Sequence, residues 1–206
     1  MIFRFSVFSA IFVPLAAFSE EVRYPAIYDV NGIDPEGALI VYTYPDTTSE
    51  PLGVIPPDAK GIEVVDSEAS GDWAEVNVSD GAGWVQTKYL TLVDSVWDRE
   101  TAPEFLSCFG EDPIWWAQVA GEHLELSIGT LLDHSMEIER IDSPEGSARA
   151  SRIITANNPD AQAMISFASS VCVLTSPEYE YALSVNVLFD SAEEHAMVTG
   201  CCSLTR

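Results

Sequence analysis

Basic side chains are scarce in this chain of 206 residues. Nine Lys and Arg stand against 33 Asp and Glu, which gives a formal net charge of −24, and lysine occurs only at Lys60 and Lys88. Proteins hold nucleic acid by placing Lys and Arg on its phosphates, so this composition argues against nucleic acid as a partner. No spaced Asp-x-Asp-x-Asp loop of a cation site occurs either. The excess charge predicts a solvated acidic surface, on which salt screens repulsion beyond about 8 Å.

Long hydrophobic runs are also missing, apart from Phe5 to Phe18 after Arg4. That pattern predicts a signal peptide over residues 1–19, cut before Glu20. The run is too short to cross about 30 Å of hydrocarbon comfortably, and no cysteine lies near the cut to carry a lipid. We therefore expect a product secreted to the bacterial periplasm or cell envelope, without a transmembrane anchor once the signal is removed.

Motifs of catalysis and metal binding are absent too. The chain has no Gly-x-Ser-x-Gly, no phosphate loop and no His-Glu-x-x-His. It has no Cys-x-x-Cys, and its three histidines are scattered, which disfavours zinc. Asp133-His134-Ser135 contains the letters of a catalytic triad, but consecutive strand residues alternate faces and cannot form the relay. The sequence predicts no catalytic residue, no metal and no cofactor.

What the chain does contain is short β-type runs separated by turn residues. In the first half they cover 38–44, 52–55, 61–65 and the pair of tryptophan-bearing segments from Trp73 to Leu90. Asp80-Gly81 between those two segments supplies the backbone of a tight hairpin turn. Closely spaced strands within about 70 residues predict a small β-barrel or sandwich.

The first half resembles the bacterial SH3-like (SH3b) family. The resemblance is carried by Leu39, Pro45, Gly53, Ile55, Val64, Trp73, Val76, Gly83-Trp84-Val85 and Tyr89-Leu90. It implies an SH3-like barrel within residues 20–93 that binds a peptide or a peptidoglycan stem peptide. The family usually carries Asn and Arg in its first strand, where this chain has Ile40 and Tyr42.

Five aromatic residues of this half are candidates for a stacking surface, because rings give a large, rigid contact area at low entropic cost. The alternative for Trp84, together with Leu90, is a role as a core plug of the barrel. The candidate ligand-binding residues are Tyr42, Tyr44, Trp73, Trp84 and Tyr89.

The second half, residues 105–206, alternates more clearly and follows a polar linker at 94–104 in which Val96 and Trp97 suggest packing. Ile114 to Val119 and Leu124 to Ile128 flank a turn at Gly121 and predict a hairpin. Later runs cover 136–141, 150–155, 163–174, 181–189 and 195–203. We expect six or seven strands in an antiparallel barrel or sandwich, and an all-β fold for the whole chain.

All four cysteines, Cys108, Cys172, Cys201 and Cys202, lie in this half. An even count in a secreted chain predicts disulfides. A bridge between the adjacent Cys201 and Cys202 would distort the peptide, whereas neighbours in a strand point to opposite faces and can reach different partners. Which of the pair joins Cys108 and which joins Cys172 stays open.

Three elements of the second half resemble a family of uncharacterised bacterial envelope proteins. They are the run from Cys108 to Trp115, the isolated Cys172 followed by Tyr179 and Tyr181, and Gly200-Cys201-Cys202. The family pattern has a Gly-Asn-Glu-Pro-Phe-Trp element, a central Cys-Ser-Asp-Gly-Met-Ser-Asp element and a closing Gly-Cys-Cys. This chain departs from the central element after Cys172. The resemblance implies β-architecture and an envelope location.

Together these features predict a non-catalytic binding protein of the envelope, which recognises a peptide, a protein partner or peptidoglycan. The negative charge would steer it towards a basic surface. The alternative is an envelope hydrolase or a thiol-redox enzyme in the second half. For the hydrolase, Glu111 and Asp112 beside Trp115 and Trp116 offer a carboxylate pair.

Overall fold

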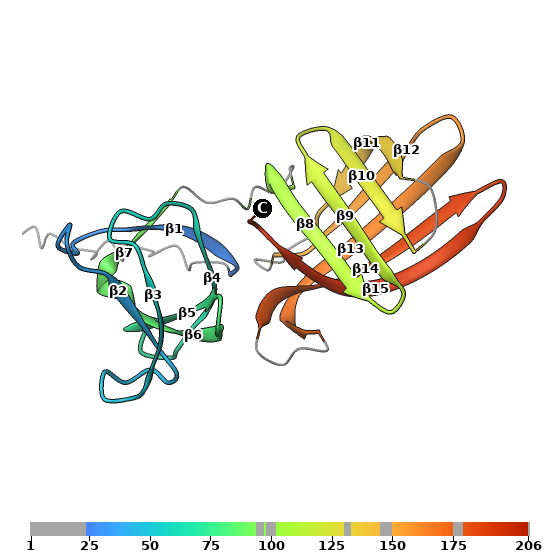
Figure 1. Cartoon of the computed structure of the whole chain (residues 1–206). Coiled ribbons are helices and arrows are strands. Elements are labelled where there is room, and N and C mark those ends of the chain that lie inside the picture. Colours follow the sequence, from blue (N-terminus) through green and yellow to red (C-terminus); the bar gives the residue numbers. More distant parts are fainter. Residues whose placement is uncertain are drawn as a thin grey trace, which may run out of the picture.

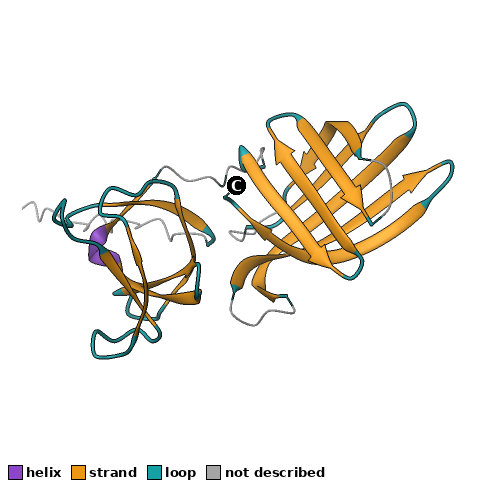
Figure 2. Ribbon diagram, viewed as in Figure 1, coloured by secondary structure: helices purple, strands orange, loops and turns teal. Residues whose placement is uncertain are grey.

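The structure of the protein is a computed structural model that describes residues 24–93, 97, 102–129, 133–144, 150–174 and 179–205. Two antiparallel sheets follow one another along the chain, and a 3-10 turn at Thr87–Tyr89 is the one helical element in those ranges (Figures 1 and 2). The all-β prediction is confirmed. Within the same ranges, no helix is long and apolar enough to cross a membrane. The predicted signal peptide, 1–19, and most of the predicted linker, 94–104, lie outside the described residues.

The first sheet, here called the small module, has seven strands in the order β3-β2-β6-β5-β4-β1-β7. It curls around a core in which Val41, Val64, Val76 and Val85 are completely buried. Alternation places these residues inside, because successive side chains of a strand point to opposite faces. The strands are β1 Ala26–Val30, β2 Leu39–Tyr42, β3 Pro51–Ile55, β4 Ile62–Ser67, β5 Trp73–Val78, β6 Gly81–Gln86 and β7 Leu90–Leu92.

The second sheet closes into a barrel in which every strand pairs with its neighbours in sequence and the last pairs with the first. This is an up-and-down barrel, a closed arrangement that leaves no sheet edge. Its interior is filled by side chains such as Leu106, Leu124, Ile154 and Phe167. The strands are β8 Phe105–Glu111, β9 Ile114–Ala120, β10 His123–Ile128, β11 His134–Asp142, β12 Arg152–Asn157, β13 Ala161–Val173, β14 Glu180–Ser191 and β15 His195–Ser203.

The barrel therefore has eight strands, and the expected count of six or seven is wrong. The missing strand is β8, whose inward positions are Leu106, Cys108 and Gly110. Glycine at an inward position interrupts the apolar alternation by which strands are recognised in sequence. The space in front of Gly110 is taken by the indole of Trp115, whose Nε1 donates to the Thr199 carbonyl at 3.0 Å. The tryptophan replaces the side chain that the strand lacks.

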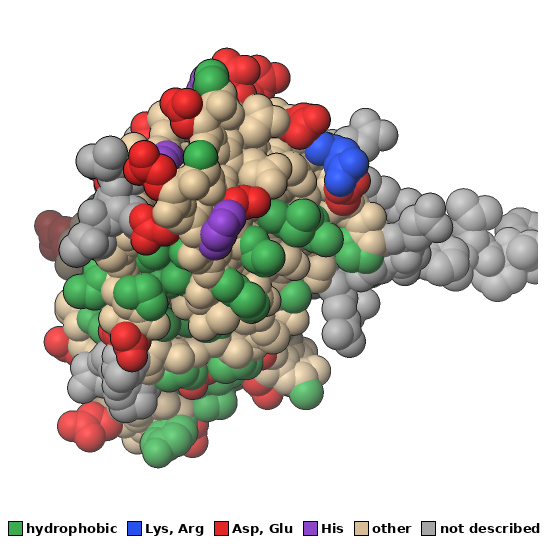
Figure 3. All heavy atoms as spheres, turned by 90° about the vertical axis from the view of Figure 1, so that its right-hand side faces the viewer, with side chains coloured by type: hydrophobic (Ala, Val, Ile, Leu, Met, Phe, Trp, Pro, Cys, Tyr) green, Lys and Arg blue, Asp and Glu red, His purple; other side chains and the backbone are tan. Residues whose placement is uncertain are grey.

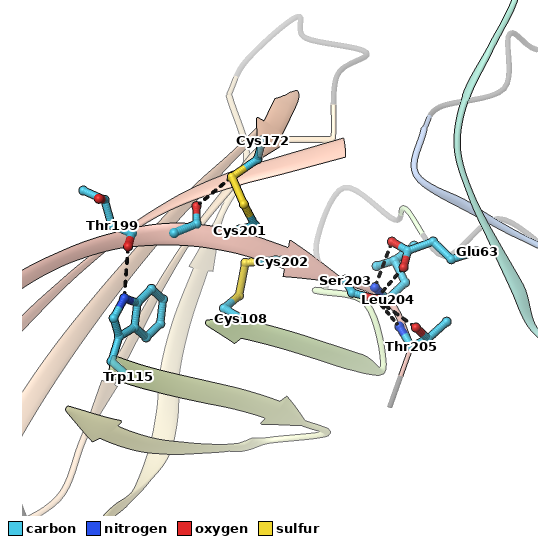
Figure 4. Close-up of a disulfide and its surroundings, with 11 residues drawn as sticks. Glu63, Cys108, Trp115, Cys172, Thr199, Cys201, Cys202, Ser203, Leu204 and Thr205 are labelled. Atoms are coloured by element: carbon cyan, nitrogen blue, oxygen red, sulfur yellow. Dashed lines mark hydrogen bonds between the residues drawn. A yellow bond between two sulfur atoms is a disulfide. The ribbon is translucent and has the colours of Figure 1, made fainter. Parts of the chain in front are cut away.

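Two disulfides join the barrel strands, and the pairing left open by the sequence is Cys108–Cys202 and Cys172–Cys201 (Figure 4). Cys201 and Cys202 point to opposite sides of β15, as neighbours in a strand must. The first bridge lies in the barrel core and links β8 to β15. The second ties β13 to β15 close to the point where the β13–β14 hairpin runs beyond the barrel towards the small module (Figure 1).

The small module and the barrel touch through several hydrogen bonds. The Asn77 side chain bonds both backbone groups of Glu180, donating to its carbonyl at 2.7 Å and accepting from its amide at 3.3 Å. The Glu63 carboxylate accepts from the Ser203 hydroxyl and from the Leu204 amide, the latter at 3.0 Å (Figure 4). Burial raises the pKa of Glu63, and these hydrogen bonds oppose the shift.

A further contact comes from the linker. Trp97 is buried in the barrel core beside Phe167, and its Nε1 donates to the Pro25 carbonyl at 2.7 Å. The linker residue thus packs, as the sequence suggested, and fixes the start of the small module.

Candidate binding site

The aromatic residues of β2, β5 and β6 gather on the outer face of the small module. Their sequence neighbours Val41, Ala74 and Val85 point into its core, so alternation turns Tyr42, Trp73 and Trp84 outward. All three rings are half-buried. This cluster of Tyr42, Trp73 and Trp84 is called the aromatic face below.

Gly83 allows the strands of this face to approach one another. A Cβ at this position would lie 2.7 Å from Cγ1 of Val41 and 2.8 Å from the Tyr42 carbonyl oxygen, closer than real Cβ contacts. Because Gly83 has no side chain, β2 can pair closely with β6, and Tyr42 is the partner of Trp84 in this pairing. The glycine of the Gly-Trp pair therefore lets Tyr42 and Trp84 lie opposite each other on the two strands.

The rings of Tyr42 and Trp73 meet edge to face, with centroids 5.8 Å apart and planes at 85°. This is a favoured geometry for aromatic pairs, because the positive ring edge lies over the negative face. The other two candidates lie elsewhere. Tyr44 is 70 % exposed in the loop after β2, and Tyr89 packs against the module's core from the 3-10 turn. Leu90 also packs against that core, whereas Trp84 is not part of it.

Carboxylates continue this face towards the barrel. Glu75 on β5 pairs with Trp84 on one side and with Asp66 of β4 on the other. Glu75, Asp66 and Glu180, the first residue of β14, line a pocket of about 190 Å³ between module and barrel. Burial, and then the charges of Glu180 and Asp66, raise the pKa of Glu75 to about 7. The site thus combines aromatic rings with concentrated negative charge.

This arrangement suits the recognition of a cationic side chain. A Lys or Arg side chain stacks its charged head over the negative face of a ring and pairs with a nearby carboxylate. In the described part of the chain, no group of three or more His, Cys, Asp or Glu side chains is placed to hold a metal ion.

Sequence reasoning found the three aromatic residues of this face but missed its carboxylates. Glu75 could have been found, since it alternates with Trp73 on one strand. Glu180 could not, because it lies more than a hundred residues further along the chain and only the docking of the β13–β14 hairpin on Asn77 brings it here.

The features that suggested an enzyme are separated or sequestered. All four cysteines are bridged, and those of the Cys108–Cys202 pair are 1 % and 0 % exposed. A reactive cysteine needs exposure to its substrate. Glu111 and Asp112 are exposed at the turn between β8 and β9, whereas the Trp115 indole points inward and is 2 % exposed. The carboxylates and that indole do not share a cleft.

Comparison with protein-family models, with characterised proteins and with solved structures finds no match to this chain.

Proposed function

We propose that this protein is a non-catalytic binding protein of the bacterial cell envelope, and that its aromatic face recognises a basic peptide segment of a protein partner. The observation that carries the proposal is the convergence of Tyr42, Trp73 and Trp84 on one outer face, next to Glu75 and Asp66. The resemblance to SH3-like envelope modules and the predicted signal peptide support the location. The two disulfides are compatible with an oxidising compartment.

A basic ligand also agrees with the whole chain. Its net charge of −24 attracts cationic surfaces and raises their rate of encounter at low salt. Peptidoglycan is itself rich in carboxylates, so attraction of unlike charges would not support its binding. A peptide that carries Arg or Lys gains from both the rings and the charges.

The test uses three immobilised pentapeptide libraries that share random outer positions and carry a central Arg, Gln or Glu. We expect the full-length protein to be retained by the Arg library, and less so as salt rises. Trp84→Ala and Glu75→Gln should each reduce retention by about tenfold, a loss of about 1.4 kcal/mol. Trp116→Ala is the matched control, because Trp116 lies on the barrel and is 39 % exposed. Equal retention on all three libraries would contradict the proposal.

Purified sacculi distinguish the peptidoglycan alternative. Co-sedimentation of the wild type that is lost in Trp73→Ala would make the wall the ligand of the aromatic face and would overturn the assignment to a basic peptide. We expect instead that neither protein is retained.

A further inference from the structure

A second concave site lies between the small module and the barrel, where β8, the start of β14 and β15 form the barrel's side of it. Its volume is about 530 Å³, which falls within the range of pockets that bind small molecules. Such pockets occur preferentially at domain interfaces. The groups used below are Glu63 from β4, Ser107 and Phe109 from β8, Tyr179 and Tyr181 at the start of β14, and Ser203 from β15.

The walls of this pocket are held in place by hydrogen bonds between module and barrel. The Tyr179 hydroxyl donates to the Ser79 carbonyl at 2.7 Å, and Asn77 holds both backbone groups of Glu180. On the opposite wall, Glu63 accepts from Ser203 and Leu204. A pocket whose walls are fixed before binding loses little conformational entropy when a ligand enters.

Aromatic rings and hydroxyl groups share its surface. The rings of Phe109 and Tyr181 meet edge to face, with centroids 5.1 Å apart and planes at 77°. The hydroxyls of Ser107 and Tyr181 have no hydrogen-bond partner among the described residues. A hydroxyl can donate one hydrogen bond and accept others, so both can bond a ligand that carries hydroxyl groups.

One acidic side chain, Glu63, lines the pocket. Burial raises the pKa of the Tyr181 phenol, and the nearby charge of Glu63 adds to this shift, with smaller effects from Tyr179 and Glu111. The same charges would repel an anionic ligand. They do not disfavour a neutral one, whose hydroxyls can donate to carboxylate and phenol oxygens.

We propose that this pocket binds a neutral carbohydrate. A sugar ring presents an apolar face of C–H groups, which pack on an aromatic ring, and a rim of hydroxyls, which pair with Ser107, Tyr181 and the free lone pair of Tyr179. Contacts of C–H groups with ring faces are individually weak, so the affinity for one or two sugar units falls in the millimolar range. The pocket contains none of the three residues of the aromatic face, although Tyr181 also lines the smaller pocket beside Glu75. The proposal does not depend on the function proposed for that face.

The experiment measures binding by saturation-transfer NMR of full-length protein with cellobiose and N,N′-diacetylchitobiose, and with glucuronic acid as the anionic comparison. We expect saturable binding of at least one neutral disaccharide and none of glucuronic acid. Tyr181→Ala should abolish the signal, and Tyr181→Phe, which keeps the ring, should weaken it by several-fold. Trp84→Ala should bind the sugar like the wild type, although its retention on the Arg library is reduced.

Three outcomes would overturn the proposal: no saturation by either disaccharide up to about 20 mM, preference for glucuronic acid, or unchanged binding by Tyr181→Ala. The melting temperature and the two disulfides of each variant are verified first. Should Tyr181→Ala fail to fold, Ser107→Ala tests the same pocket from β8, because it removes the hydroxyl and adds no atom. Wild-type affinity in Ser107→Ala and Tyr181→Phe together would also reject the site.

Discussion

At the scale of single residues, Trp115 packs closely against two glycines of the barrel. A Cβ at Gly110 would overlap Nε1 of the indole, and a Cβ at Gly200 would overlap the Phe109 carbonyl oxygen and lie 2.8 Å from Cζ2 of the same ring. The indole therefore fills the space in front of Gly110, and the β8 backbone together with the indole leaves no room for a side chain at Gly200. These two glycines belong to the elements that resemble the uncharacterised envelope family, and these contacts give both a packing reason.

We expect Gly110→Ala to destabilise the protein by about 3 kcal/mol, because an extra methyl in a filled core forces its neighbours to move. Gly121→Ala is the control: its φ of +60° costs strain, but nothing lies within 4 Å of the added Cβ, so a loss of about 1 kcal/mol is expected. Urea unfolding measures both. Gly110→Ala should lower the free energy of unfolding by less when it is introduced into a Trp115→Leu background. Equal losses of unfolding free energy in Gly110→Ala and Gly121→Ala would argue against the packing explanation.

Glu75 makes stability depend on pH. Its pKa is raised from 4.5 to about 7, first by burial and then by Glu180 and Asp66. The folded state thus binds this proton more tightly than the unfolded state does. The resulting stabilisation is fully present below pH 4.5 and is lost as pH rises through about 7.

The melting temperature of Glu75→Gln should therefore fall less than that of the wild type between pH 5 and pH 8, with the variant the more stable protein at pH 8. Glu125→Gln, on an exposed position of β10, provides the comparison. If Glu75→Gln and Glu125→Gln changed the pH profile equally, the raised pKa could not be the cause.

At the scale of elements, the two disulfides perform different tasks. Cys108–Cys202 joins the first and last strands of the barrel across 94 residues, whereas Cys172–Cys201 spans 29 residues and holds the β13–β14 hairpin on β15. In the chain-entropy description, the two bridges contribute about 5 and about 4 kcal/mol. The two stabilisation energies are similar, but the bridges differ in position: Cys172–Cys201 lies next to the contact of the β13–β14 hairpin with the small module.

We expect Cys172→Ser/Cys201→Ser to loosen the hairpin in a barrel that remains folded. Hydrogen exchange at the Glu180 amide, which donates to Asn77, should accelerate at least tenfold, while amides of β9 and β10 stay protected. Cys108→Ser/Cys202→Ser should instead accelerate exchange throughout the barrel. If hydrogen exchange accelerated uniformly in both variants, the Cys172–Cys201 bridge would have no local role.

Individual elements also show which parts of the fold can be predicted from the sequence alone. The Trp73 and Trp84 hairpin was predicted because alternation and Asp80-Gly81 are local signals, and the long barrel strands were found for the same reason. β8 was missed because Gly110 breaks its alternation. The disulfide pairing and the position of Glu180 depend on contacts between distant segments, and no local pattern encodes them. The function of the aromatic face stays a prediction.

At the scale of the whole molecule, charge is the dominant property. Figure 3 shows Asp and Glu side chains spread over the end of the barrel, with few basic ones among them. A net charge of −24 makes the folded state repel itself, since unfolding moves these charges apart. The same charge that favours a basic partner therefore weakens the fold at low ionic strength.

Salt should accordingly stabilise this protein without any ligand. We expect the melting temperature at pH 8 to rise by roughly 5 °C between 10 mM and 500 mM NaCl, because the Debye length shortens from about 30 Å to a few ångströms. At pH 4, where about half of ordinary carboxyl groups are protonated, the rise should be much smaller. Calorimetry at both pH values measures the two shifts.

A melting temperature insensitive to salt at pH 8 would mean that neighbouring ion pairs such as Lys60 with Asp29, 3.0 Å apart, already compensate the repulsion. An equal rise at both pH values would attribute the effect to general salt action on apolar surface rather than to charge.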